Sequence, residues 1–112
     1  MDIKAYKNQL TILSVEAQYV KKYNDQAQVL AAVYQAILRK DNTVNVADVT
    51  KWLGHKADNM NVAEVLKSLK KAKLVGKKGF LMFNVSYDLP SADMWNHQDQ
   101  LDVLNQFVVD VM

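Results

Sequence analysis

Two nearly identical hexapeptides near the middle of the chain decide how its fold is predicted: Val-Asn-Val-Ala-Asp-Val at 44–49 and Met-Asn-Val-Ala-Glu-Val at 60–65. Each has an asparagine at its second position and an acid three residues later, the pattern of an N-cap with its capping-box partner. Each also has apolar residues that flank the first helical turn, as in a hydrophobic staple. The repeat therefore predicts two short helices that begin at about 46 and 62.

The residues that follow each hexapeptide predict where these helices end. Gly54 supplies a left-handed C-terminal turn for the first helix. The second helix is expected over 62–73, and its apolar face comprises Val62, Val65, Leu66, Leu69 and Ala72. Beyond it, 74–87 contains two β-prone runs that flank the glycine-bounded pair Lys77 and Lys78. This pattern predicts a β-hairpin with the two lysines at its tip.

Longer helices are expected on both sides of this central region. Over 3–23, apolar residues recur at alternating spacings of three and four, which predicts a helix that Asn24 and Asp25 interrupt. Asp25 is then expected to cap a second helix, with Gln28 as its capping-box partner. That helix extends to about residue 40, and its one buried face comprises Val29, Leu30, Val33, Ile37 and Leu38. A last helix with the same alternating spacing is expected over 92–111.

Composition limits the classes of protein that the sequence fits. The chain has 112 residues, half of them hydrophobic, which suits one domain with one core. We divide it into an N-terminal helix (1–24), a central region (25–90) and a C-terminal helix (91–112). No stretch approaches the ~20 apolar residues of a membrane span. The chain has no cysteine, and its first residues lack the apolar block of a signal peptide, so we expect a cytoplasmic protein.

The net charge of +2 is distributed unevenly along the chain. Residues 1–25 carry +1, residues 26–90 carry +5 and residues 91–112 carry −4. Six lysines lie within 61–79, where Glu64 is the one acid. A basic cluster of this kind is typical of a surface that meets phosphate.

The expected order of elements is a helix, a short extended piece, a helix, a turn, a helix and a two-stranded hairpin. Over 26–87, the sequence resembles bacterial winged helix-turn-helix regulators of the MarR or PadR kind. The resemblance rests on 49–54 (Val-Thr-Lys-Trp-Leu-Gly) and 65–75 (Val-Leu-Lys-Ser-Leu-Lys-Lys-Ala-Lys-Leu-Val). It implies a mainly α fold with a small β-hairpin wing, flanked by N- and C-terminal helices that form a homodimer. It also implies double-stranded DNA as the partner.

Under this interpretation, the DNA-contacting residues lie on the surface of the second short helix, in the turn before it and at the hairpin tip. The candidates are His55, Lys56, Asn59, Asn61, Lys67, Ser68, Lys70, Lys71, Lys77 and Lys78. Lys67 and Lys71 are one turn apart, so both are expected to reach phosphates or base edges. Asn61 and Glu64 are expected mainly to cap the helix. An ordinary solvated lysine face remains the alternative for the whole set.

The terminal helices provide the candidate dimer interface. Its residues are Ile3, Tyr6, Leu10, Leu13, Val20, Met94, Leu101, Leu104, Phe107, Val108 and Val111. Their apolar seams are large for a small domain to leave in water, so pairing is expected. Whether the helices pair within one chain or between two stays open. Trp52 is expected in the core, and Trp95 in the core, at the dimer junction or in a ligand pocket.

Catalytic and metal sites are not expected. The sequence has no glycine-rich phosphate loop, no nucleophile elbow and no zinc-binding helix motif. Asp93 and His97 are one helical turn apart, but two ligands make only part of a metal site. We therefore expect no enzyme activity, no cofactor and no metal.

Besides a replication or packaging protein that binds DNA without regulating transcription, two functions remain. The first is sequence-specific binding of double-stranded DNA as a homodimeric transcriptional regulator. The alternative is a winged-helix protein-protein interaction module, such as a phage or plasmid accessory protein or a replication-associated protein. Arg39 is the one arginine in the chain, and arginine is the usual reader of guanine, so the alternative stays open.

Overall fold

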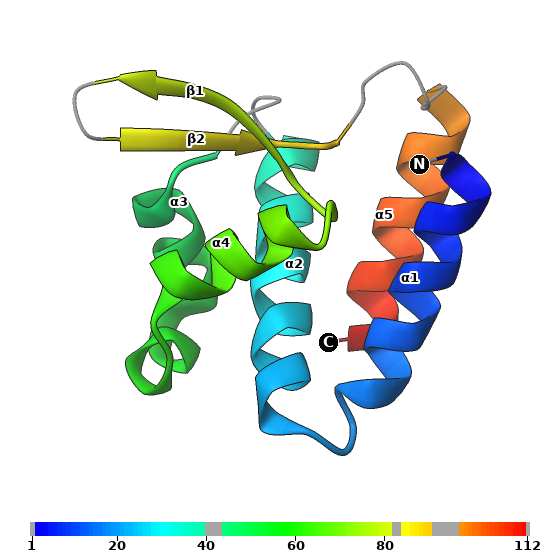
Figure 1. Cartoon of the computed structure of the whole chain (residues 1–112), viewed down its shortest axis with the longest axis horizontal. Helices are drawn as coiled ribbons and strands as arrows, with labels where there is room; N and C mark the ends of the chain where they lie inside the picture. Colours follow the sequence, from blue (N-terminus) through cyan, green and yellow to red (C-terminus); the bar gives the residue numbers. More distant parts are fainter. Residues whose placement is uncertain (1, 40–43, 82–83, 91–96, 112) are drawn as a thin grey trace.

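The helix α2 lies at the centre of the fold (Figure 1). The computed structural model describes residues 2–39, 44–81, 84–90 and 97–111. Its elements are α1 (Ile3–Glu16), α2 (Lys21–Arg39), α3 (Val46–Leu53), the 3₁₀ helix η1 (Gly54–Asn59), α4 (Val62–Lys71), β1 (Gly76–Leu81), β2 (Asn84–Asp88) and α5 (His97–Val111). Figure 1 shows α1 and α5 on one side of α2 and α3 and α4 on the other. The prediction of a mainly helical chain with a small β-hairpin is confirmed.

Helices pack on both sides of α2, so this helix is buried almost all round. Every residue from 29 to 34 is at most 4% exposed. A helix with one buried face would instead keep a polar stripe in water. Four alanines let the neighbouring helices approach closely: Ala27, Ala31, Ala32 and Ala36. The residues predicted for the apolar face of this helix are therefore correct, but the buried surface of the helix extends beyond that face.

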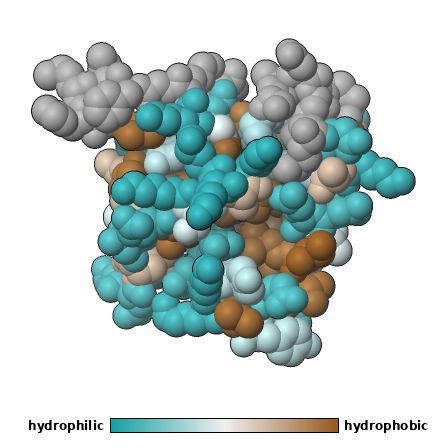
Figure 2. All heavy atoms as spheres, in the orientation of Figure 1, coloured by the Kyte–Doolittle hydropathy of each residue, from teal (hydrophilic) through white to brown (hydrophobic). Residues whose placement is uncertain are grey.

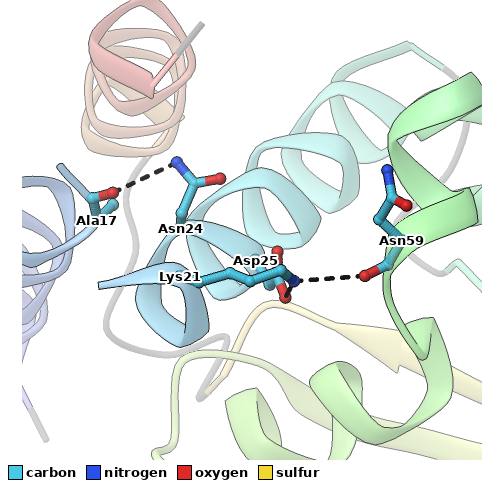
Figure 3. Close-up of polar contacts among 5 residues, drawn as sticks. All are labelled: Ala17, Lys21, Asn24, Asp25 and Asn59. Carbon is cyan, nitrogen blue, oxygen red and sulfur yellow. Dashed lines mark hydrogen bonds and ion pairs between the residues drawn. The ribbon is translucent and has the colours of Figure 1, made fainter. Parts of the chain in front are cut away.

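The first helix ends earlier than the sequence suggests. α1 stops at Glu16 and α2 starts at Lys21, so the predicted helix over 3–23 and its break at Asn24 are wrong. The amides of residues 18 and 19 bond to carbonyls three residues back, which tightens the chain into a turn. The Asn24 side chain then donates to the Ala17 carbonyl at 3.3 Å (Figure 3). The turn contains no glycine or proline that would reveal it in the sequence. It forms where α1 packs back onto α2.

The predicted capping box of Asp25 and Gln28 is also wrong, because both residues lie inside α2. The Asp25 carboxylate accepts from Lys21 Nζ at 2.8 Å. Gln28 accepts from Lys56 Nζ at 3.0 Å and donates to the Val111 carbonyl at 3.4 Å. Asp25 thus bonds within α2, whereas Gln28 bonds to two other elements that its local sequence does not reveal.

The two repeated hexapeptides start helices as predicted. Asn45 Oδ1 accepts from the Asp48 amide at 2.9 Å, and Asp48 accepts from the Asn45 amide at 3.1 Å, which completes a capping box. Asn61 Oδ1 accepts from the Glu64 amide at 3.2 Å. α3 therefore begins at 46 and α4 at 62, and Gly54 follows α3 with a φ of 60°. No Cβ fits that conformation without strain.

The hairpin forms, but its predicted tip is wrong. Lys77 and Lys78 lie within β1, where Lys77 pairs with Tyr87 and the register shifts between Lys77 and Gly79. The strands join through 82–83, which lie outside the described residues. Val44 adds an isolated bridge to Tyr87, with bonds of 2.9 and 2.7 Å, so a short extended piece precedes α3 as expected. The glycines at 76 and 79 suggested that the two lysines lie in a turn. The pairing of Lys77 with Tyr87 instead places them within β1.

The apolar seams of the terminal helices are used within one chain. The seam residues at most 6% exposed are Tyr6, Leu10, Leu13, Leu104 and Phe107. Val108 and Val111 are half-buried against the same core, and Ile3 is half-buried while Val20 is 39% exposed. The buried members therefore form no surface for a second chain, and that part of the predicted dimer interface is wrong. Met94 and the Leu101 side chain lie outside the described residues.

The remaining expectations concern the two tryptophans, the pair of Asp93 and His97, and a membrane span. Trp52 is 37% exposed at the surface of α3, so its predicted place in the core is wrong. Trp95, Asp93 and the His97 side chain lie outside the described residues, so their roles stay predictions. In the part of the chain that the structure describes, no helix is long and apolar enough to cross a membrane.

Candidate nucleic-acid interface

The outer face of α4 carries a row of exposed charged side chains. Val62, Leu66 and Leu69 are at most 7% exposed and define the inward direction of the helix. At ~100° per residue, Glu64 and Lys71 point directly away from them, with Lys67 beside this line. Lys67, Lys70 and Lys71 are all exposed. Figure 2 shows hydrophilic side chains over α4 at the centre of this view.

The turn after α4 adds another lysine to this face. Lys73 adopts a φ of 63°, and its amide bonds to the Lys70 carbonyl at 3.0 Å. The Leu74 amide bonds to the Leu69 carbonyl at 2.9 Å. These two bonds make a Schellman motif, in which the left-handed position is usually glycine. The helix thus ends at Lys71, two residues before the prediction, and an exposed lysine occupies a strained position.

Lys67 connects the face of α4 with the hairpin. Its Nζ lies 3.3 Å from Glu64 Oε1, and both side chains are more than 60% exposed. Burial raises the pKa of Tyr87 in β2, and the positive charge of Lys67 acts in the opposite direction. The positive charge of Lys67 on α4 therefore acts on a phenol of β2.

The hairpin contributes Lys77 to this surface, because its side chain in β1 is exposed. Lys78 belongs to the same strand, and its side chain lies outside the described residues. These lysines therefore lie along β1 and not at the tip of the hairpin.

The turn residues predicted to contact DNA are not gathered with the lysines of α4. Lys56 directs its Nζ to Gln28 on α2, which also bonds to the end of α5. His55 is fully exposed in η1, with Nδ1 3.6 Å from the Asp58 carboxylate. The Asn59 carbonyl accepts from Lys21 Nζ at 3.3 Å (Figure 3). These residues therefore mainly shape the loop before α4.

Two other predicted contact residues use their side chains within α4. Asn61 Oδ1 caps the helix, as expected. The Ser68 hydroxyl donates to the Glu64 carbonyl at 3.1 Å and is half-buried. Ser68 also lines a groove of about 320 Å³ between α4 and the start of α2. The two residues support the helix more than they present hydrogen bonds to a ligand.

That groove contains two lysines that the sequence analysis missed. Lys21 and Lys22 line it from α2, opposite Glu64 and Val65. Lys21 is bound by Asp25, whereas Lys22 lies 5.8 Å from the centre of the Tyr23 ring. The adjacent lysines were visible in the sequence, but the misplaced helix break assigned them to the end of the first helix.

A buried pair of tyrosines holds the C-terminal end of α4 in position. The Tyr6 hydroxyl of α1 donates to the Leu74 carbonyl at 2.8 Å, and it shares a hydrogen bond with the Tyr34 hydroxyl of α2. The Tyr34 ring meets the Phe107 ring of α5 edge-on, with 5.5 Å between centroids. Burial raises the pKa of both phenols, so both stay protonated at neutral pH. Three helices thus fix the point where α4 leads into the hairpin.

No metal site is found among the side chains of this surface that the structure describes. Within the described ranges, no three histidine, cysteine, aspartate or glutamate side chains come together as a metal site. No family model, no curated protein and no solved structure matches this chain.

Proposed function

We propose that this protein binds double-stranded DNA, with α4 in the major groove and the hairpin on the adjacent phosphate backbone. The observation that carries the proposal is the set of exposed lysines on α4, in the turn after it and on β1: Lys67, Lys70, Lys71, Lys73 and Lys77. Glu64 is the one acid in 61–79. An α-helix fits the major groove, and lysines on its flanks neutralise phosphates.

The arrangement around α4 supports a winged-helix interpretation. α2, α3 and α4 pack together, and the extended residue Val44 pairs with β2 of the hairpin that follows α4. In a winged helix, the second helix of the helix-turn-helix reads the groove and the hairpin touches the flanking backbone. The effect of the Lys67 charge on the pKa of Tyr87 in β2 fits such an arrangement.

Fluorescence anisotropy with random-sequence duplex DNA, at several salt concentrations, tests the proposal. If each protein chain contacts about four to six phosphates, the logarithm of the affinity falls with the logarithm of salt at a slope near −4 or −5. Binding of this kind supports the function. No binding at low salt contradicts it.

The homodimeric regulator remains part of the proposal, although it needs a surface other than the buried seams. The large apolar side chains that stay exposed on the terminal helices and the turn after α1 are Ile12, Val15, Tyr19, Val20 and Val109. A dimer through such residues would present two α4 helices to one DNA duplex. Sedimentation of the intact protein measures whether it forms: a mass of two chains supports the dimer, and a mass of one chain contradicts it.

One observation favours the alternative, a protein-interaction module. Ile12, Val15 and Tyr19 are 61%, 50% and 80% exposed and follow one another at spacings of three and four. Exposed apolar side chains of this kind, two on α1 and one in the turn after it, are typical of a surface that binds a partner protein. Co-precipitation with Ile12→Asp as the control distinguishes specific partners from background.

A further inference from the structure

Glu64 is the acid on the otherwise basic outer face of α4, and capping leaves its carboxylate free for another role. Asn61 Oδ1 accepts from the Glu64 amide, which satisfies half of a capping box. Among the described residues, the carboxylate bonds to Lys67 at 3.3 Å and does not return to the Asn61 amide. In α3, the matching Asp48 does return that bond. The side chain of Glu64 is 64% exposed.

The place of Glu64 on α4 points toward base edges. It lies opposite the buried residues Val62, Leu66 and Leu69, so it is on the part of the helix that enters a groove most deeply. It is also in the first turn, and the N-terminal residues of a recognition helix are the ones that contact bases. A carboxylate next to phosphate is repelled. At the floor of the groove, it meets the amino groups of bases.

We propose that Glu64 reads a cytosine in the major groove while Lys67 contacts the guanine of the same base pair. The inference rests on the proposed function. Cytosine presents its N4 amino donor in the major groove, and guanine presents the acceptors O6 and N7. Glu64 Oε1 and Lys67 Nζ offer one acceptor and one donor 3.3 Å apart, which matches this pattern. The ion pair thus makes the protein specific for a C·G pair at one position of its site.

The competing role for Glu64 is a surface acid that merely weakens binding. The two roles differ in what removal of the charge does to sequence preference. A repulsive acid lowers the affinity for every sequence alike, so its removal strengthens binding to all of them. An acid that reads cytosine discriminates by about five- to a hundredfold between cytosine and the other bases at one position. Its removal abolishes that discrimination.

Binding-site selection from a randomised duplex library tests the proposal with the wild-type protein and three variants. Glu64→Gln keeps the shape of the side chain and adds a donor, so the selected base changes from cytosine to adenine. Glu64→Ala loses the preference at that position and binds random DNA more tightly. Glu16→Gln makes the same charge change on α1 and selects the same sequences as the wild type.

The outcomes separate the inference from the function on which it rests. A cytosine that is selected by the wild type and lost in both Glu64 variants supports the proposal. Identical preferences in the wild type and Glu64→Gln overturn it, and so does binding without any preference. Both of those results leave DNA binding intact. Absence of binding by every protein overturns the inference together with the proposed function.

Discussion

α3 and α4 start from nearly the same hexapeptide, yet they end and face the surroundings differently. At the start of α3, the capping box closes through Asp48, whereas at the start of α4 the Glu64 carboxylate bonds to Lys67. α3 is followed by Gly54 at a φ of 60°, and α4 by Lys73 at a φ of 63°. A positive φ is thus adopted by a glycine without strain after α3 and by a lysine with backbone strain after α4.

The exposed side chains of α3 and α4 also differ. α3 carries one lysine, Lys51, and exposes Trp52, while α4 and its turn carry four exposed lysines. A short repeated sequence therefore determines where a helix begins, and the residues after it determine what the helix presents. Five measurements test this comparison, in order of decreasing effect.

Charge reversal on α4 is expected to have the largest effect. Lys67→Glu combined with Lys71→Glu replaces two attractive charges with two repulsive ones on the face that meets DNA. We expect duplex affinity to fall by about a hundredfold or more at ~0.1 M salt. Fluorescence anisotropy measures the loss, and circular dichroism checks that the helices remain.

Lys4→Glu combined with Lys51→Glu is the matched control, because it makes the same charge change on α1 and α3. If the control pair weakens binding as much as the α4 pair, the distinction between the two helices is wrong.

Removal of the tyrosine tether at the end of α4 has the next largest effect. Tyr6→Phe leaves the buried Leu74 carbonyl and the Tyr34 hydroxyl short of a partner, so we expect the free energy of unfolding to fall by about 2 kcal/mol. Urea denaturation measures this change. Tyr19→Phe removes the same hydroxyl at a position that is 80% exposed, and it should leave the stability unchanged.

Tyr6 and Tyr34 make the free energy of unfolding depend on pH in the alkaline range. Burial raises the pKa of Tyr6 and Tyr34 above the ordinary value of 10.0, so only the unfolded chain ionises near that pH. Their contribution is present below pH ~10 and is lost as the pH rises above it. Urea titrations from pH ~8 to ~10.5 should show this loss, and it should be smaller in Tyr6→Phe. Equal losses in both proteins would contradict the assignment.

The two N-caps should differ by a smaller amount. Asn45→Ala combined with Asp48→Ala removes both bonds of the capping box, and we expect the pair to cost about 1.5 kcal/mol. Asn61→Ala removes one bond and should cost about 1 kcal/mol. Asn8→Ala, at an exposed position within α1, is the control. A loss of about 1.5 kcal/mol or more from Asn61→Ala combined with Glu64→Ala would show that the Glu64 carboxylate also serves the cap.

Relief of the strain after α4 has the smallest effect. Lys73→Gly should raise the free energy of unfolding by about 0.5 kcal/mol, because glycine tolerates the positive φ. It should also weaken duplex binding by about threefold, through the loss of one phosphate contact. Lys73→Ala keeps the strain and loses the charge, so it should weaken binding without the gain in stability. An unchanged affinity in both variants would exclude Lys73 from the DNA-binding surface.

The sequence by itself determined the helix starts at 46 and 62, the hairpin after α4 and the basic character of 61–79. These features depend on capping side chains, periodicity and charge, which act over a few residues and are therefore readable from local sequence. The candidate residues Lys67, Lys70, Lys71 and Lys77 were found in this way, and all four are exposed.

Only the tertiary structure decided the turn after Glu16, the placement of Lys77 within β1 and the burial of the terminal seams in one chain. The break between α1 and α2 carries no glycine or proline, since it forms where α1 packs back on α2. Tyr6, for example, meets Tyr34 and Leu74 across separations of 28 and 68 residues. An apolar seam shows that a helix needs a partner. Which helix becomes that partner depends on the three-dimensional packing of the whole chain.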